Sequence, residues 1–489
     1  MDQSVVIVGG GLGGLSAAIH LAAAGRRITL LEKNARLGGK ANLIAEQGYF
    51  FDTGPSLLTM PWVVRQLYEV AGKRLEDDLE LVQLELTCRY QWLDHTTFNA
   101  FQTLPLLLQE IERLEPRDVE GFLRFVAYTR RIYDAVAEPF LKSPFDGLGD
   151  MLTPALIRDS WKIDSLRTVD ASVRSFFRSP YLRQVFNRYT TYNGSSPYRA
   201  PATFNIIPYV EFAEGGWYIK GGMYVLVEAL TRLAQHLGVD IHTEAPVTRV
   251  AVEHGSARGV IVAGEERIDA DQVVINVDPH YAYQHLLPPK KCVVQATQQP
   301  ELSCSGFVLL LGVNRIYEHI AHHNIFFSHD YPREFAAIFD KRIPPADPTI
   351  YICASSVSDP DHAPPGHMNM FVLVNAPTTN GHVNWQHEAE GYRNMVIARL
   401  ERMGMTNLSQ HIVYEQIMTP ADIESLYNAP GGAIYGLASN NLWSAFLRPP
   451  LRARDIARLY FVGGGTHPGG GIPLVLLSGR AVAHQMLSR

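Results

Sequence analysis

The fold of this chain is decided by SVVIVGGGLGGLSAAIHLAAAGRRITLLEKNARLGGK, the stretch from Ser4 to Lys40. Its first part, Val5–Val8, is an apolar β-branched run of the kind that forms a buried parallel strand. Small residues from Leu15 to Ala24 predict a closely packed helix, and the glycines before them predict a tight turn. Strand, glycine-rich turn and helix in this order indicate the start of a doubly wound dinucleotide-binding domain.

The turn fits the spacing G-x-G-x-x-G at Gly9, Gly11 and Gly14. The first glycine of this pattern permits the turn, the second lets the backbone approach a pyrophosphate, and the third lets the helix pack closely on the strand. A second strand, Arg27–Leu31, ends at Glu32, where a carboxylate can accept hydrogen bonds from an adenosine ribose. Because an acid at this place disfavours a 2′-phosphate, we expect FAD or NAD rather than NADP.

A secretory signal peptide is the alternative for this stretch. Residues 5–24 carry only two polar side chains, Ser16 and His20, and end in three alanines. The first four residues carry no basic side chain, however, and the five glycines between Gly9 and Gly14 make a poor membrane helix. We therefore expect a folded domain here and no signal peptide.

The composition is that of a large protein that leans toward apolar residues. Of the 489 residues, 46% are hydrophobic and 19% are charged, and the formal net charge is -6. The apolar leaning is consistent with an apolar cavity or a membrane-facing patch, and the negative charge argues against nucleic-acid binding. No later apolar run reaches the roughly 18–20 residues of a spanning helix, so any membrane contact is expected to be peripheral.

Four scattered cysteines are expected to be reduced core residues that form no metal site and no disulfide framework. They are Cys88, Cys292, Cys304 and Cys353.

The rest of the chain divides into parts of three kinds. Strand and helix patterns return to the first domain twice, so this domain is expected to be discontinuous and to comprise residues 1–95, 216–295 and 431–489. Residues 96–215 have little strand signal and many aromatic and basic residues, which predicts a mostly helical insertion with either a membrane-contacting or a plain solvated face. Alternating strands and helices over residues 296–430 predict an α+β substrate domain.

A second glycine-rich turn closes the chain. Strand Leu459–Val462 runs into GGGTHPGGGIP, residues 463–473, and a helix follows from Leu474 to Leu487. This order gives a second helix N-terminus that can face a cofactor. Near the other end of the chain, GGK at residues 38–40 adds a flexible, anion-friendly loop just past the ribose carboxylate.

Taken together, these motifs resemble the phytoene-desaturase-type carotenoid oxidoreductases of bacteria, and the resemblance covers almost the whole chain. The motifs are the first glycine turn with Glu32, GGK at 38–40, FDTGP at 51–55, KGGM at 220–223 and GTHPGGGIP at 465–473. Within the family, three stretches resemble the terminal-methyl oxidases of C30 diapocarotenoids more than the desaturases: GPSLLTMP at 54–61, GAIYG at 432–436 and PGGGIP at 468–473.

The resemblance implies both a fold and an activity. The fold is a Rossmann-type, amine-oxidase-like FAD-binding domain with an α+β substrate domain and a helical, membrane-associating insertion. The activity is FAD-dependent oxidation of a linear carotenoid, expected to be C30, at its terminal methyl group, with oxygen or a quinone as electron acceptor. The protein is then expected in the cytoplasm, peripheral on the cytoplasmic membrane. The main alternative is a desaturase that inserts double bonds into the polyene, and weaker ones are an amine oxidase and a non-catalytic carotenoid-binding flavoprotein.

The same resemblance supplies most of the candidate site residues. Those expected to contact FAD are Gly9, Gly11, Gly13, Gly14, Glu32, Gly38, Gly39, Lys40, Gly54, Pro55, Ser56, Val247, Gly464, Gly465, Gly471, Ile472 and Pro473.

Catalysis on a hydrocarbon needs an electron acceptor more than an acid–base pair, because the substrate has no group of useful pKa. His467 and Glu214 are the candidate catalytic residues, against the plainer alternatives of a turn-holding histidine and an ion-paired carboxylate. His322 and His323 lack ligand spacing and are expected to be ordinary core or surface residues.

Overall fold

The structure is a computed structural model that describes residues 3–137, 162–288, 301–379, 381, 383–441 and 448–488. A five-stranded parallel sheet forms the centre of the first domain. Its order is β19 (Leu459–Phe461), β13 (Gln272–Ile275), β1 (Ser4–Val8), β2 (Arg27–Leu31) and β9 (Asp240–His242). Every neighbouring pair in it is parallel. The strands come from three separate parts of the chain, as expected for a discontinuous domain, and all of them run parallel.

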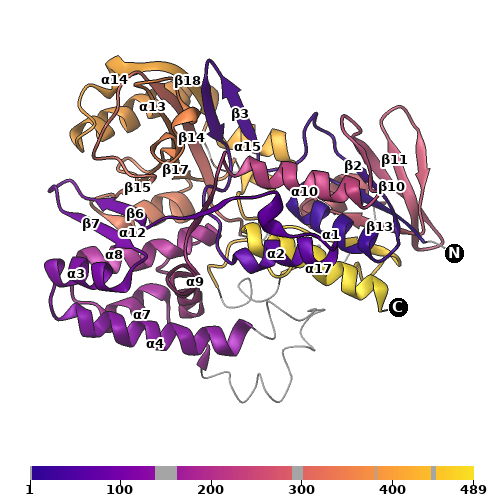
Figure 1. Cartoon of the computed structure of the whole chain (residues 1–489), viewed down its shortest axis with the longest axis horizontal. Coiled ribbons are helices and arrows are strands. Elements are labelled where there is room, and N and C mark those ends of the chain that lie inside the picture. Colours follow the sequence, from indigo (N-terminus) through magenta and orange to yellow (C-terminus); the bar gives the residue numbers. More distant parts are fainter. Residues whose placement is uncertain are drawn as a thin grey trace.

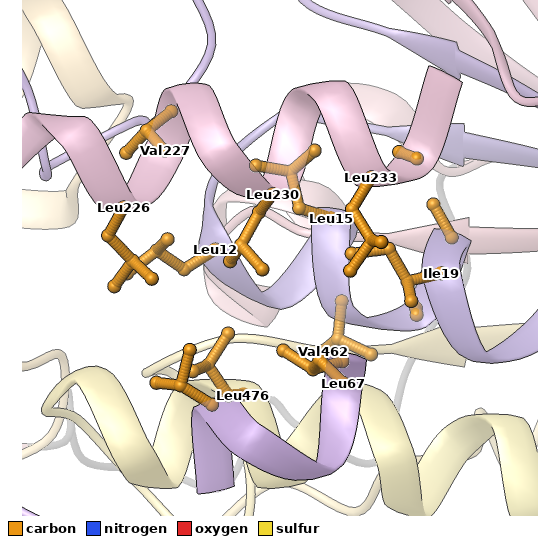
Figure 2. Packing of buried hydrophobic residues seen from close by; sticks show 14 of the residues in the cluster. Leu12, Leu15, Ile19, Leu67, Leu226, Val227, Leu230, Leu233, Val462 and Leu476 are labelled. Atoms are coloured by element: carbon orange, nitrogen blue, oxygen red, sulfur yellow. The ribbon is translucent and has the colours of Figure 1, made fainter. Parts of the chain in front are cut away.

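Helices cover one face of this parallel sheet. They are α1 (Leu12–Ala23), α2 (Pro61–Val70), α10 (Tyr224–His236) and α17 (Ile472–Leu487). Figure 2 shows the α1 side chains Leu15 and Ile19 packed against Leu230 and Leu233 of α10. Helices α1 and α17 approach closely at Gly479, where an added Cβ atom would lie 2.6 Å from the backbone nitrogen of Ala17. The small residues in the opening helix therefore serve tight helix packing.

A three-stranded antiparallel sheet covers the other face. It consists of β10 (Val247–Glu253), β11 (Ser256–Val262) and β12 (Arg267–Asp269). In β1, Val5 and Ile7 belong to the helix-side core, while Val6 and Val8 belong to the core beneath β10 and β11. Because successive side chains of a strand point to opposite faces, both faces of β1 are apolar and buried.

A mixed seven-stranded sheet forms the second half of the molecule. Its order is β18 (Ile412–Met418), β14 (Ser305–Val313), β17 (Met368–Ala376), β16 (Ile350–Cys353), β15 (His323–Phe326), β6 (Leu86–Gln91) and β7 (Thr97–Phe101). All nine residues of β14 are buried. Helix α13 (Trp385–Arg402) covers one face of β14, and the hairpin of β3 (Leu43–Glu46) and β4 (Tyr49–Asp52) covers the other.

Helices pack against the β6–β7 edge of this sheet. They are α3 (Leu104–Leu114), α4 (Asp118–Val136), α7 (Val169–Phe176), α8 (Pro180–Arg188) and α9 (Ile206–Glu214). An aromatic core holds them together, in which the rings of Phe177 and Phe186 stack with centroids 4.3 Å apart. Residues 138–161 of the predicted insertion lie outside the described residues. Among the helices that are described, none combines the length and the apolar character needed to cross a membrane.

The remaining elements are short. They are β5 (Leu81–Gln83) paired with β8 (Trp217–Ile219), and the helices α11 (Pro279–Tyr281), α12 (Tyr331–Ala336), α14 (Leu408–His411) and α15 (Pro420–Tyr427). Figure 1 shows both chain termini at the end of the molecule that holds the parallel sheet, with α13, α3 and α4 at the opposite end.

One predicted domain boundary differs from the structure. Residues 86–95 were expected in the first domain, but β6 pairs in parallel with β15 of the seven-stranded sheet, with Arg89 opposite Asn324. The physical reason is packing, because Tyr90 of β6 stacks on Phe327, with ring centroids 5.7 Å apart. An alternating pattern predicts a strand but does not say which sheet it joins. The other domain boundaries stay a prediction.

Candidate active site

A cavity of about 650 Å³ lies between the two halves of the molecule. On one side it is lined by the glycine-rich turns that follow β1 and β19. On the other side strands of the seven-stranded sheet supply apolar side chains: Val308, Ile325, Phe371, Leu373 and Met418. One continuous space therefore joins a nucleotide-type turn to an apolar wall.

Every residue predicted to contact FAD lines this cavity except Gly14. Gly14 has a packing role, since an added Cβ atom would lie 2.2 Å from the carbonyl oxygen of Gly9. Gly9 (φ 99°), directly after β1, and Gly471 (φ 101°), directly before α17, adopt positive φ values that L side chains rarely take. Glycine is thus needed for close packing at Gly14 and for a positive φ at Gly9 and Gly471.

Glu32 lies where the sequence predicts the ribose-binding carboxylate. It follows β2, is buried with 5% of its surface exposed, and lines the cavity. Its Oε2 atom accepts a hydrogen bond from the Gly10 N–H at 2.8 Å, and Oε1 accepts one from the Asn34 N–H at 2.9 Å. A carboxylate has about four acceptor positions. The backbone therefore fixes the orientation of this carboxylate and leaves capacity for ribose hydroxyls.

Two helix N-termini face the cavity. Helix α1 begins after Gly11 and α17 begins after Gly471, and neither has a side-chain cap or an acidic residue in its first turn. The first N–H groups of a helix lack partners within the helix and attract anionic groups. Side chains are excluded at this place, because a Cβ atom on Gly13 would lie 2.7 Å from Asn276 Oδ1 and 3.0 Å from the Gly463 nitrogen. The cradle therefore fits a dinucleotide that carries a pyrophosphate, as FAD does.

Buried cations hold the loops around the second turn. Lys40 donates hydrogen bonds to the carbonyl oxygens of residues 433 and 434, and burial lowers its pKa to about 8, an effect that the charge of Asp278 partly opposes. Arg448 donates to the Gly464 carbonyl at 3.1 Å, and burial lowers its pKa to about 10. These side chains are tied to backbone carbonyls, so their first role is to fix the shape of the cofactor end.

A neutral chain of polar groups lies on the substrate side of the cavity. The hydroxyls of Ser56 and Tyr351 are 2.5 Å apart, and the Tyr351 hydroxyl is 2.8 Å from His323 Nδ1. Burial raises the pKa of Tyr351 well above its usual value and lowers that of His323 well below its usual value. All three residues line the cavity and are uncharged near neutral pH. They can orient an oxygen atom by hydrogen bonds without placing a charge in the cavity.

One cation lies among aromatic rings in the same part of the wall. The guanidinium of Arg188 donates a hydrogen bond to the Tyr90 hydroxyl at 2.8 Å and lies over the rings of Tyr189 and Tyr192. The hydroxyls of these two tyrosines both donate to the buried carboxylate of Glu211. The charges of Arg188 and Glu211 are thus balanced through the tyrosines, which indicates a structural role for the group.

The two predicted catalytic residues do not line the cavity. Glu214, at the end of α9, accepts hydrogen bonds from Trp62 Nε1 at 3.0 Å and from the Tyr133 hydroxyl at 3.1 Å. His467 is 6% exposed and lies within the second turn, where the Thr466 hydroxyl donates to its carbonyl oxygen. Catalytic roles for Glu214 and His467 stay predictions that this geometry does not support.

The cavity also contains residues that the sequence analysis did not select. Asn276 and Asp278 follow the carboxyl end of β13, which is where ligands bind in doubly wound sheets, so their position was a usable signal. Asn276 also donates a hydrogen bond to the Gly9 carbonyl at 3.0 Å and so links two turns of the cradle. His323 and Tyr351 carry no local signal, because they reach the cavity only through the pairing of β15 with β16.

Comparisons with known proteins agree with this geometry. The family described as flavin containing amine oxidoreductase matches residues 12–487. A 4,4'-diapolycopene oxygenase of Methylomonas sp. is 38% identical over 100% of this chain and 98% of its own length. A zeta-carotene-forming phytoene desaturase of Myxococcus xanthus is 34% identical over 99% of this chain and 94% of its own length. The crystal structure of an oxidoreductase from Methanosarcina mazei has the same fold, with a TM-score of 0.67 at 17% identity over 99% of this chain and 100% of that one.

These matches confirm the predicted amine-oxidase-like FAD-binding fold and the prediction of FAD as cofactor, and the membrane association of the helical insertion stays a prediction. The match to the diapolycopene oxygenase covers both glycine-rich turns and the sheet that forms the apolar wall of the cavity. The chain is an FAD-dependent oxidoreductase and belongs to the flavin containing amine oxidoreductase family.

Proposed function

We propose that this enzyme oxidises a linear C30 carotenoid at its terminal methyl group. The observation that carries the proposal is the continuous cavity, which joins the FAD cradle to an apolar wall that contains the neutral chain Ser56, Tyr351 and His323. A hydrocarbon substrate suits such a wall, and an oxygen-bearing product end suits the hydroxyls. The 38% identity to a 4,4'-diapolycopene oxygenase over the full length supports the same assignment.

The parts of the site divide the work between cofactor and protein. Bound FAD supplies the hydride-accepting chemistry, for which no side chain of the protein is suited. The α1 turn and Glu32 hold the nucleotide, and the α17 turn lies where it can contact the other end of the cofactor. Apolar side chains of the seven-stranded sheet orient the polyene and exclude water. Tyr351, held by Ser56 and His323, positions the oxygen-bearing end.

The assignment of residues to FAD is part of this proposal and has its own test. Replacing Glu32 with Gln substitutes an NH₂ donor for one of two carboxylate oxygens that already accept backbone N–H groups. A hydrogen bond to a charged group is worth about 1.5–3 kcal/mol, so we expect FAD to dissociate about 10–100 times more readily. The flavin content of the purified variant and its equilibrium dissociation constant measure this. Wild-type affinity in Glu32→Gln would refute the role given to Glu32.

A desaturase that inserts double bonds into the polyene is the second candidate. The specific observation in its favour is the 34% identity to a phytoene desaturase over nearly the full length of both chains. The apolar wall suits either reaction. The hydroxyls of Ser56 and Tyr351 can bind an oxygen-bearing product, which terminal oxidation forms and desaturation does not. We therefore prefer the oxidase.

Pigment analysis separates the two candidates. The full chain is expressed in cells that accumulate a coloured linear C30 carotenoid, and the pigments are analysed by mass spectrometry. The control is the Gly13→Ala variant, which is expected to lose FAD. Products that gain oxygen in the wild type alone support terminal oxidation. Products that lose only pairs of hydrogen atoms support the desaturase. Unchanged pigment with the FAD-loaded wild type would refute both. Repeating the assay without oxygen, with and without an added quinone, identifies the electron acceptor.

We also propose that the enzyme works at the cytoplasmic face of the membrane, where a long polyene would dissolve. Three leucines of the helical region support this, because they are unusually exposed: Leu104 (49%), Leu123 (47%) and Leu166 (91%). In a liposome flotation assay we expect the wild type to float and Leu166→Ser to float less. A wild type that stays in the soluble fraction would refute the proposal.

A further inference from the structure

Two histidines and a cysteine meet in the wall behind the substrate side of the cavity. His323 is the first residue of β15 and lies opposite Cys353, the last residue of β16, in the antiparallel pairing of these strands. His322 precedes β15, and its ring centroid is 4.4 Å from that of His323. One ligand atom from each of the three residues lies within 4.8 Å of the others. Residues that are far apart in the sequence thus form a compact N₂S donor set.

The hydrogen bonds of this group leave two ring nitrogens unused. His322 Nδ1 is 2.8 Å from the Ser358 hydroxyl, and His323 Nδ1 is 2.8 Å from the Tyr351 hydroxyl. His322 is 4% exposed and His323 is 3% exposed, and the Nε2 atom of each is buried without a hydrogen-bond partner. Each unpaired buried polar atom lowers the stability of the fold by about 1–3 kcal/mol. Two such atoms in neighbouring side chains therefore indicate a ligand that pairs with both. Metal-binding histidines commonly have this arrangement, with one nitrogen held by a neighbouring group and the other free for the ion.

The third group fits the same interpretation. Cys353 is a free cysteine, buried with 7% of its surface exposed. Nitrogen from imidazole and sulfur from a thiolate are the ligands that Zn²⁺ prefers in proteins. In a tetrahedral zinc site the ligand atoms stand about 3.3–3.8 Å apart, so the three groups need to approach by no more than about 1.5 Å.

We propose that His322, His323 and Cys353 bind one Zn²⁺ ion. Binding replaces the thiol proton of Cys353 with a sulfur–zinc bond and releases that proton to solvent, with no change of oxidation state. Three protein ligands leave the fourth tetrahedral position to water or another small donor. The ion would tie β15 to β16 and fix the ring of His323, which lines the cavity. The inference does not depend on which carotenoid reaction the enzyme performs.

Metal analysis of the purified, FAD-loaded full chain tests the proposal. After incubation with excess Zn²⁺ and gel filtration, we expect one equivalent of zinc per wild-type chain and at least about tenfold less in Cys353→Ala and in His322→Gln. The matched control is Cys304→Ala, which removes another buried free cysteine whose thiol contacts Asn375. We expect this control to retain zinc as the wild type does.

Thermal unfolding separates loss of the ion from loss of folding. In chelator-treated protein, Zn²⁺ should raise the unfolding temperature of the wild type and of Cys304→Ala but not that of Cys353→Ala, because only an ion that binds the native state stabilises it. Failure of the wild type to retain zinc, or equal retention by Cys353→Ala and His322→Gln, would overturn the proposal. Copper or iron at the same stoichiometry would overturn the assignment to zinc.

Discussion

At the scale of single residues, the cradle is sensitive to one added methyl group. Gly13→Ala places a Cβ atom 2.7 Å from Asn276 Oδ1, closer than real Cβ contacts come, and 3.0 Å from the Gly463 nitrogen, which is a tight contact. The Asn276 side chain must then move, which disturbs its hydrogen bond to the Gly9 carbonyl, and the backbone at Gly463 must shift by a few tenths of an ångström. We therefore expect this variant to fold and to lose most of its FAD, measured as flavin absorbance per purified chain.

A second glycine gives the matched control. Gly391 lies in the interior of helix α13, is exposed, and has no atom within 4 Å of an added Cβ. Gly391→Ala should keep all its FAD and gain about 1 kcal/mol of unfolding free energy, because alanine is the better helix former. Equal flavin content in the two variants would contradict the role of Gly13.

Residue types and their spacing predicted the cofactor end of the site but not the substrate end. The glycine turns and Glu32 could be recognised because each does its work within a few residues of its neighbours in sequence, and they line the cavity as expected. Tyr351 and His323 could not be recognised. Their function depends on a hydrogen bond between two strands, and no local pattern records which strands pair.

At the scale of elements, helix α1 should give the protein a specific acid sensitivity. Burial, helped by the charge of Arg480, lowers the pKa of His20 on α1 from 6.5 to about 4. Between pH 6.5 and about 4 the unfolded chain takes up a proton at this position and the folded chain does not, so stability falls as the pH falls through this window. His20→Gln removes this proton uptake. From pH 7 to pH 5 the variant should lose about 2 kcal/mol less unfolding free energy than the wild type.

Urea unfolding at the two pH values measures this difference. The matched variant is His236→Gln, which removes an exposed histidine from the last turn of α10, the helix packed against α1. If His20→Gln and His236→Gln lose the same amount of stability on acidification, burial of His20 does not cause the acid sensitivity.

The elements differ in how well their sequence predicts them. β2 has the predicted limits, and α1 begins three residues earlier than expected, at Leu12, because the glycines of the turn already adopt helical geometry. These elements pack against neighbours in the sequence. β6 pairs instead with β15, more than 200 residues away, and this long-range pairing places β6 in the other half of the molecule.

At the scale of the whole molecule, FAD should act as part of the structure. The parallel sheet is assembled from three separate parts of the chain, and the turns that line the cavity begin at residues 9 and 463. A cofactor that contacts both turns joins the first helix of the fold to the last one. A ligand that binds only the folded state at 100 times its dissociation constant stabilises that state by about 2.7 kcal/mol. Removing FAD should therefore lower the unfolding temperature, and adding it back should restore the original value.

Hydrogen exchange shows where this stabilisation acts. In the FAD-free protein we expect faster exchange of backbone amides at residues 9–14 and 463–473 together, because each turn loses the partner that held it. Amides of β14, which is buried within the second sheet, should change little and serve as the internal reference. Faster exchange at only one of the two turns would mean that the cofactor does not bridge them. Helices α1 and α17 also pack directly on each other, so this contact alone already couples the two turns. The effect of the cofactor is therefore the additional protection that both turns gain when FAD is added back to the FAD-free protein.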